Sequence, residues 1–235
     1  MSFRSVRAAF GLGAALLLSV GGCARAQEQP LPPGVKAGPW TDLLGDGASK
    51  HWRGYRLDTL PQAWSHDPAT GVLTRTRFGG DIVTRQQFTD FEFVIEWKVG
   101  PGGNNGIKYL VSEARPSTPG PEYQMIDDAM IPDALHQTAS FYEVLAPRVK
   151  TPARPPGDWN QSRLVISGNH VEHWLNGVMV LDYELGSAEV KAGVAKSKFK
   201  NVRGFDEKIR GHILLTNHNR ETWFRNIRLR ELPVK

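Results

Sequence analysis

The chain contains one cysteine among its 235 residues, and that cysteine, Cys23, lies close to the N-terminus. The sequence after it therefore forms no internal disulfide, and packing alone must stabilise its core. The chain also lacks a large excess of charge of either sign. The formal net charge is +5, and it falls to +3 when residues 1–22, with Arg4 and Arg7, are removed. So small an excess does not indicate a nucleic-acid partner.

Long apolar runs are missing as well. The run around residues 14–18 is shorter than the roughly 20 residues that span a bilayer, and it follows two arginines, as in a secretory signal peptide. Small residues precede Cys23, as in a bacterial lipobox. We therefore predict a lipoprotein signal peptide over residues 1–22, lipidation at Cys23 and a flexible tether over residues 23–37. The expected location is the bacterial cell envelope or periplasm, and cleavage after Ala26, giving a soluble exported protein, is the alternative.

No segment has a convincing amphipathic helical pattern, and period-two alternation dominates instead. Residues 90–98 alternate apolar with mostly charged side chains, which predicts a half-buried strand. Its core-facing residues are expected to be Phe91, Phe93, Ile95 and Trp97. A hairpin is expected where Asn176 and Gly177 separate two further strand patterns, because this dipeptide suits the two positive-φ positions of a type I′ turn.

Further short strands are expected along most of the remaining chain, near residues 71–76, 82–85, 106–111, 122–126, 163–167, 212–217 and 223–232. About ten strands separated by Gly, Pro and Asn turns predict one all-β domain over residues 38–235, built as an antiparallel sandwich. The proline-rich residues 112–121 and 146–158 are expected to be loops that could wall a binding cleft.

The most informative feature for function is a group of three carboxylates within seven residues: Glu122, Asp127 and Asp128. Acidic residues are disfavoured in strands and repel one another, so their clustering indicates a polar ligand, a proton transfer or a cation. A solvated strand end would give the same pattern. As the carboxylate pair of an ordinary glycosidase, Glu122 and Asp128 fit poorly, because they would lie about 20 Å apart on an extended strand.

Several segments, taken in order, resemble the family of bacterial 3-keto-disaccharide hydrolases, also described as 3-keto-glucoside 1,2-lyase/hydratase domains. The resemblance covers most of residues 38–233. It implies a concanavalin A-like jelly roll whose concave sheet holds sugar, and it implies export. The segments that carry it include residues 90–92, 104–109, 122–128, 132–134, 158–160, 173–177, 197–199, 211–215 and 224–227.

The resemblance implies elimination followed by hydration. A C3 ketone acidifies the C2 proton, a base removes that proton, the aglycone leaves from C1, and water adds to the enone. The predicted catalytic residues are Glu122, Lys108, Asp128 and His218, with Glu122 the preferred carboxylate and the division between base and acid left open. The predicted substrate-binding residues are Gln124, Asn104, Tyr123 and Trp159.

Two strand-face arguments support part of this assignment. Glu122 and Gln124 share one face of their strand by alternation, whereas Lys108 projects away from Ile107 and Tyr109. A solvated side chain is the alternative for Lys108. The alternative function is a noncatalytic carbohydrate-binding module, because one fold serves both uses.

One departure from the family concerns His218. Where the family usually reads Leu-Gln-Asp-His-Gly, this chain has Asn217 in place of the aspartate, and His218 would then be a poorer base or acid. Zinc-binding spacings and a His-Glu-x-x-His motif are missing, so no cofactor is expected. A structural calcium ion at Asp127, Asp128 and Asp133 is the unfavoured alternative. The oligomeric state is left open.

Overall fold

The computed structural model describes residues 30–31, 34–75, 79–115, 120–150, 152–216, 218 and 220–234. The predicted signal peptide, Cys23 and most of the predicted tether lie outside these residues. From Leu31 onward the chain forms one compact unit. Among the helices in the described part of the chain, none is long and apolar enough to cross a membrane.

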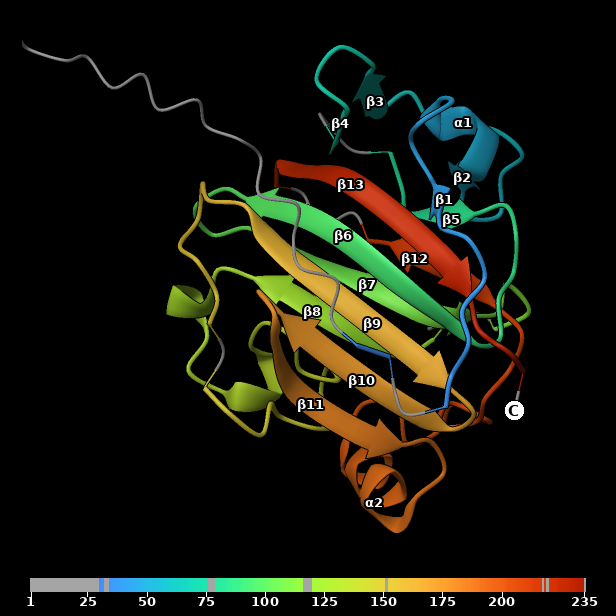
Figure 1. Cartoon of the computed structure of the whole chain (residues 1–235). Coiled ribbons are helices and arrows are strands. Elements are labelled where there is room, and N and C mark those ends of the chain that lie inside the picture. The colour runs from blue at the N-terminus through green and yellow to red at the C-terminus, as the bar shows by residue number, and fades with distance from the viewer. Residues whose placement is uncertain are drawn as a thin grey trace, which may run out of the picture. The chain divides into compact units, whose positions relative to one another are not determined.

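Two antiparallel sheets form a sandwich, as predicted (Figure 1). The eight-stranded sheet has the order β11-β10-β9-β6-β13-β4-β3, and β1 also pairs with β13. Its strands are β1 (Thr41–Asp42), β3 (Trp64–Asp67), β4 (Val72–Arg75), β6 (Phe91–Val99), β9 (Asn160–Ser167), β10 (His170–Leu175), β11 (Val178–Glu184) and β13 (Thr222–Glu231). The five-stranded sheet has the order β2-β5-β12-β7-β8. Its strands are β2 (Trp52–Gly54), β5 (Ile82–Thr84), β7 (Asn104–Val111), β8 (Glu122–Ile126) and β12 (His212–Leu215).

Strand β6 has the predicted core face, but it is more than half-buried, because Glu92 (1% exposed) and Val94 (5%) on its other face are covered as well. Its four predicted core residues are at most 1% exposed, and they are Phe91, Phe93, Ile95 and Trp97. The predicted hairpin is also confirmed, because Asn176 (φ 49°) and Gly177 (φ 84°) both have the positive φ of a type I′ turn between β10 and β11.

The described residues also contain two α-helices, the single turn α1 (Ala48–His51) and α2 (Ala188–Lys196), which the search for amphipathic patterns did not reveal. The side chain of Ser187 caps α2 by accepting a hydrogen bond from the Val190 N–H at 3.2 Å. Val190 is the one residue of α2 that is fully buried. The helix therefore has no apolar stripe that a search for periodicity could detect.

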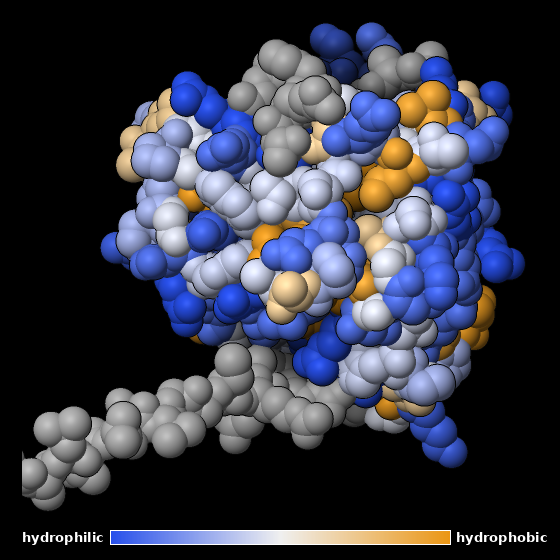
Figure 2. Space-filling view, turned by 90° about the horizontal axis from the view of Figure 1, so that it is seen from above, coloured by the Kyte–Doolittle hydropathy of each residue, from blue (hydrophilic) through white to orange (hydrophobic). Residues whose placement is uncertain are grey.

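The core fills the space between the sheets, and a second, smaller apolar cluster lies on the opposite face of the five-stranded sheet. We call this opposite face the outer face. Val83, Val111 and Leu214 form the small cluster and Tyr55 packs against it, whereas Ile213, next to Leu214, faces the core. Figure 2 shows a largely hydrophilic surface on the side it presents, with apolar residues in small patches.

Candidate functional site on the outer face of the five-stranded sheet

Strands β7 and β8 bring the main predicted residues together. Lys108 pairs in register with Glu122, and Gly106 pairs with Gln124. Because Ile107 belongs to the core, Lys108 and its cross-strand partner lie on the outer face. The shared face of Glu122 and Gln124, and the opposite orientation of Lys108 and its neighbours in sequence, are therefore as predicted.

The carboxylate of Glu122 is held close to the sheet surface. Glu122 is only 7% exposed, and its Oε2 lies 3.7 Å from the Nζ of Lys108. A Cβ atom added at Gly106 would lie 2.0 Å from Oε1 of Glu122. Glycine at position 106 is therefore what leaves room for the carboxylate in this position.

The surroundings of Glu122 change the pKa of its carboxyl group. Burial raises the pKa of the Glu122 carboxyl above its ordinary value, and the negative charge of Asp81 acts in the same direction. The positive charges of Lys108 and Lys198 oppose this rise in pKa. A buried carboxyl with a raised pKa, close to a lysine, has the properties of an acid–base catalyst.

His218 belongs to the same electrostatic environment. Its side chain is exposed, yet the surrounding protein atoms remove enough water to lower the pKa of the imidazole. Asp81 raises that pKa, while Lys108 and Lys198 lower it further, as does Arg75. Position 217, where the family has an aspartate and this chain has Asn217, lies outside the described residues. The carboxylate of Asp81 acts electrostatically on His218.

We call Asp81, Lys108, Glu122, Lys198 and His218 the outer-face cluster. Sequence reasoning identified three of these residues and missed Asp81 and Lys198. Asp81 immediately precedes the three-residue strand β5, and Lys198 follows α2. The segment 197–199 carried the family resemblance, and this was the one signal that could have pointed to Lys198.

Asn104 shares the outer face but lies at the start of β7, opposite Ile126. Its Oδ1 is buried and has no hydrogen-bond partner among the described residues. Asp128 lies beyond the end of β8, where its Oδ1 accepts a hydrogen bond from the Thr138 N–H at 2.7 Å. The structure therefore does not bring Asp128 into the outer-face cluster.

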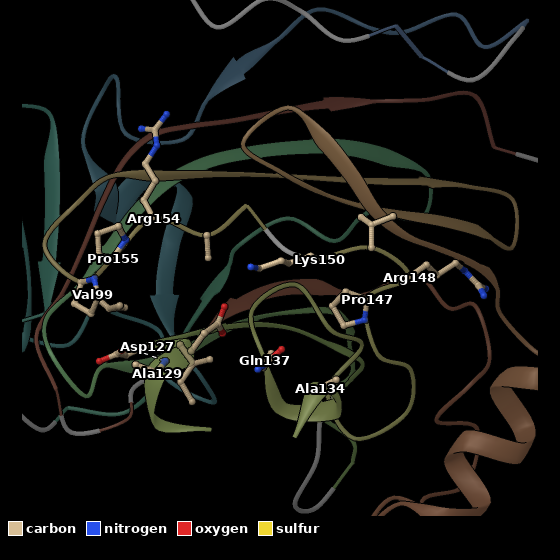
Figure 3. A pocket seen from close by; sticks show the side chains of 15 residues that line it. Val99, Asp127, Ala129, Ala134, Gln137, Pro147, Arg148, Lys150, Arg154 and Pro155 are labelled. Atoms are coloured by element: carbon tan, nitrogen blue, oxygen red, sulfur yellow. Dashed lines mark hydrogen bonds between the residues drawn. The ribbon is translucent and has the colours of Figure 1, made fainter. Parts of the chain in front are cut away.

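Asp128 instead lines a separate pocket of about 630 Å³ (Figure 3). Residues 147–150 and 153–156 line one side of this pocket, and they belong to the proline-rich segment 146–158 that was predicted to be able to wall a cleft. Asp127 lines it too, but its carboxylate caps turns by accepting hydrogen bonds from the N–H groups of Gly102 and Ala129. No residue of the outer-face cluster lines this pocket, so this cavity and the candidate chemistry do not coincide.

The aspartates considered for calcium serve separate turns. Asp127 caps the short helix η1 (Asp128–Met130), and Asp133 caps η2 (Ala134–His136). Within the described ranges, no group of three or more His, Cys, Asp or Glu side chains is placed to hold a metal ion.

Two predicted substrate-binding residues lie elsewhere. Tyr123 is fully buried in the core, and its hydroxyl donates to the carbonyl of Trp174 at 3.1 Å. Trp159 lies on the outer side of the eight-stranded sheet, with Lys98 at 5.2 Å and Arg225 at 4.1 Å from its ring centroid. Alternation along β8 turns Tyr123 toward the core, away from the face of Glu122 and Gln124, so it cannot contact a substrate there. The loop before β9 carries Trp159 to the eight-stranded sheet.

The architecture defines this chain as a concanavalin A-like jelly roll with a polar cluster on the outer face of one sheet. Residues 39–230 match the family model described as the 3-keto-alpha-glucoside-1,2-lyase-like domain. The chain belongs to this family, as the sequence segments predicted.

Named relatives agree with the family match. The chain is 31% identical to a protein of Bacteroides thetaiotaomicron named 3-keto-disaccharide hydrolase, over 88% of this chain and 83% of that protein. A candidate glycosyl hydrolase from Parabacteroides distasonis superposes with a TM-score of 0.74 and is 26% identical, over 83% of this chain and 94% of that one. A second such structure from the same organism, 22% identical with a TM-score of 0.68, covers 83% of this chain and 100% of its own and has the same fold.

Proposed function

We propose that this chain is an exported enzyme that cleaves 3-keto-glycosides, including 3-keto-disaccharides, by elimination and hydration. Membership of the 3-keto-alpha-glucoside-1,2-lyase-like family supports the substrate class, as does the name of the Bacteroides relative. The observation that carries the proposal is the buried carboxylate of Glu122, which lies 3.7 Å from the ammonium group of Lys108 on an outer sheet face.

Each step assigns one proton or one bond to a residue of the cluster. Glu122 takes the proton from C2, and the electron pair moves to the C3 oxygen, where the Lys108 ammonium stabilises the enolate. The enolate then collapses: the C3 carbonyl re-forms, C1 and C2 become doubly bonded, and the C1–O bond to the aglycone breaks. His218, which is exposed, passes a proton from solvent to the departing oxygen, and its lowered pKa favours release of that proton.

Hydration completes the reaction. Water adds its hydroxyl to C1 of the enone, and Glu122 returns to C2 the proton that it removed. The proton that the water loses passes to His218, which gave one to the departing oxygen, so the net change is hydrolysis. The raised pKa of Glu122 suits both directions, because an acid–base group works best when its pKa is close to the working pH.

The test is release of monosaccharide from a 3-keto-disaccharide by the wild type and by Glu122→Gln. The substitution keeps the size of the side chain and removes the base, so turnover should fall by about 10²–10⁴-fold while binding changes little. Glu184→Gln, at the exposed end of β11, is the matched control and should keep turnover within about twofold. Equal rates for Glu122→Gln and wild type would exclude Glu122 as the base. A wild type that cleaves none of the 3-keto-glycosides tested would favour a carbohydrate-binding module.

Export with a lipid anchor is a separate part of the proposal. It rests on the short apolar run and on the small residues before Cys23. Cys23→Ser should release the protein from the membrane fraction. A wild type that is already fully soluble, with Gln27 as its first residue, would contradict the lipid anchor but not the export.

A further inference from the structure

The five-stranded sheet continues past β8 as an irregular segment, residues 139–145. The N–H of Ala139 donates to the carbonyl of Gln124 at 2.8 Å, and the N–H of Tyr142 donates to the carbonyl of Glu122 at 3.0 Å. Phe141 bridges to Tyr123 and is fully buried. Tyr142 is therefore the neighbour of Glu122 at this edge of the sheet, and its ring packs against the rim of the core and against His136, with 5.0 Å between ring centroids.

Lys198 lies over the ring of Tyr142, with its Nζ 4.2 Å from the ring centroid. Glu143 holds this lysine at two points: its Oε1 is 3.1 Å from Nζ, and its Oε2 accepts a hydrogen bond from the backbone N–H of Lys198 at 2.9 Å. The lysine side chain nevertheless remains 53% exposed. It is therefore a fixed donor that still faces solvent.

The charge of Lys198 is stable at neutral pH. Burial alone would lower the pKa of its ammonium group, but the contacts with Glu143 and Tyr142 raise the pKa above its ordinary value. Lys198 also acts electrostatically on Glu122 and on His218. It is therefore suited to binding rather than to proton transfer.

The opposite side of Glu122 is closed. Beyond Lys108 the outer face carries Val83, Val111 and Leu214, which are fully buried beneath neighbouring groups that include Tyr55. Loop contacts hold this covering in place, since Glu113 accepts two hydrogen bonds from the guanidinium of Arg53, at 2.9 and 2.8 Å. The side of residues 142 and 198 thus remains as a direction in which a substrate seated over Glu122 and Lys108 can extend.

We propose that Tyr142 and Lys198 form the subsite for the leaving half of the substrate, which we infer to be a hydroxyl-rich ring. The ammonium group of Lys198 donates hydrogen bonds to the hydroxyls of a sugar, and Tyr142, whose ring the ammonium group covers, holds it in that position. The inference rests on the proposed function, because it assigns one half of a two-part substrate. Tyr142 and Lys198 are specificity residues in this scheme, while Glu122 and Lys108 act on the reacting ring.

The test compares two substrates that share the reacting ring: a 3-keto-disaccharide and the methyl glycoside of 3-keto-glucose. Lys198→Met keeps the stem of the lysine and removes its charge. It should lower kcat/KM for the disaccharide at least tenfold more than for the methyl glycoside, chiefly through KM. Tyr142→Leu should show the same selectivity. Lys200→Met, an exposed lysine two residues away, is the matched control and should leave the ratio of the two kcat/KM values unchanged.

Two results would overturn the subsite. Equal losses on both substrates would show that Lys198 acts on the reacting ring, and no loss on either would show that it does not contact substrate. Failure of the wild type on both substrates would instead contradict the proposed function. Calorimetric titration with the unoxidised disaccharide then decides the subsite alone: binding weakened at least threefold by Lys198→Met supports it, and unchanged binding overturns it.

Discussion

Lys108 and Tyr109 are neighbours on β7, yet they belong to two very different polar groups. Lys108 is part of the outer-face cluster, whereas the hydroxyl of Tyr109 lies in the core, 3.0 Å from Nε2 of His173. Tyr183 donates to Tyr109 in turn. Nδ1 of His173 donates to the carbonyl of Ala139 at 2.9 Å, because a carbonyl can only accept, and so Nε2 is the acceptor for Tyr109.

The inner group is closed and the outer group is open. In the inner group, the hydroxyls of Tyr183 and Tyr109 and both ring nitrogens of His173 all have hydrogen-bond partners. Burial lowers the pKa of His173 to about 4, so its ring stays neutral. In the outer-face cluster the ammonium of Lys108 has, among the described residues, a single ion-pair contact, 3.7 Å from Glu122. Satisfied buried networks stabilise a fold, whereas loosely paired charges remain available to a substrate.

The largest expected effect concerns the closed group. In the unfolded chain His173 binds a proton below pH 6.5, the ordinary pKa of histidine. In the folded protein it stays neutral until about pH 4. This residue should therefore lower the free energy of unfolding by roughly 3 kcal/mol as the pH falls through that window. Urea unfolding at several pH values measures the slope. His173→Gln should remove the part of the pH dependence that comes from His173. Tyr183→Phe removes a group that does not titrate in this pH range, so it should leave the pH dependence unchanged. An unchanged slope in His173→Gln would contradict the assignment.

A smaller effect is expected for the open group. Gly106→Ala would place a methyl group where Oε1 of Glu122 now lies, so the carboxylate must move away from its position beside Lys108. We expect turnover to fall by about tenfold to hundredfold, with about 1 kcal/mol lost in the free energy of unfolding. Gly100→Ala, where an added Cβ meets no atom within 4 Å, is the control. Full activity in Gly106→Ala would show that the position of the carboxylate does not matter.

The smallest effect is expected on the far sheet. Arg225 pairs with Glu96 at 2.7 Å and lies over Trp159, but its side chain is 37% exposed. Arg225→Ala should therefore cost less than about 1 kcal/mol in the free energy of unfolding and leave turnover unchanged. Chemical denaturation and the 3-keto-disaccharide assay measure the two quantities. Reduced turnover would restore a substrate role for the Trp159 side of the molecule and blur the contrast between the two faces.

Local alternation was sufficient to predict much of this fold. Together with the Asn-Gly turn signal, it identified β6, β8 and the hairpin at Asn176 and Gly177. It also placed Glu122 and Gln124 on one face, because the two-residue period of a strand can be seen in the sequence alone. It could not detect α2, whose stability depends on a serine cap and one buried valine. The two-residue strand β1 is likewise too short to show a period.

The tertiary structure determines which residues come together at the site. Asp81 and Lys198 join Glu122 through the pairing of β5 in the sheet and through the turn after α2, and neither relation has a local signal. Asp128 is close to Glu122 in sequence but remains at the other end of β8. Strand geometry already separates these two carboxylates by about 20 Å. Asp128 entered the prediction through the family resemblance, whereas the partners of Glu122 come from distant segments.

The segment 139–145 has a further consequence for assembly. β8 is the last strand of its sheet, and a bare edge strand offers a template on which other chains can pair and aggregate. The hydrogen bonds from Ala139 and Tyr142 already occupy carbonyl groups of that edge. The contacts that keep an aromatic ring beside Glu122 thus also protect the edge of the sheet from strand addition by a second molecule.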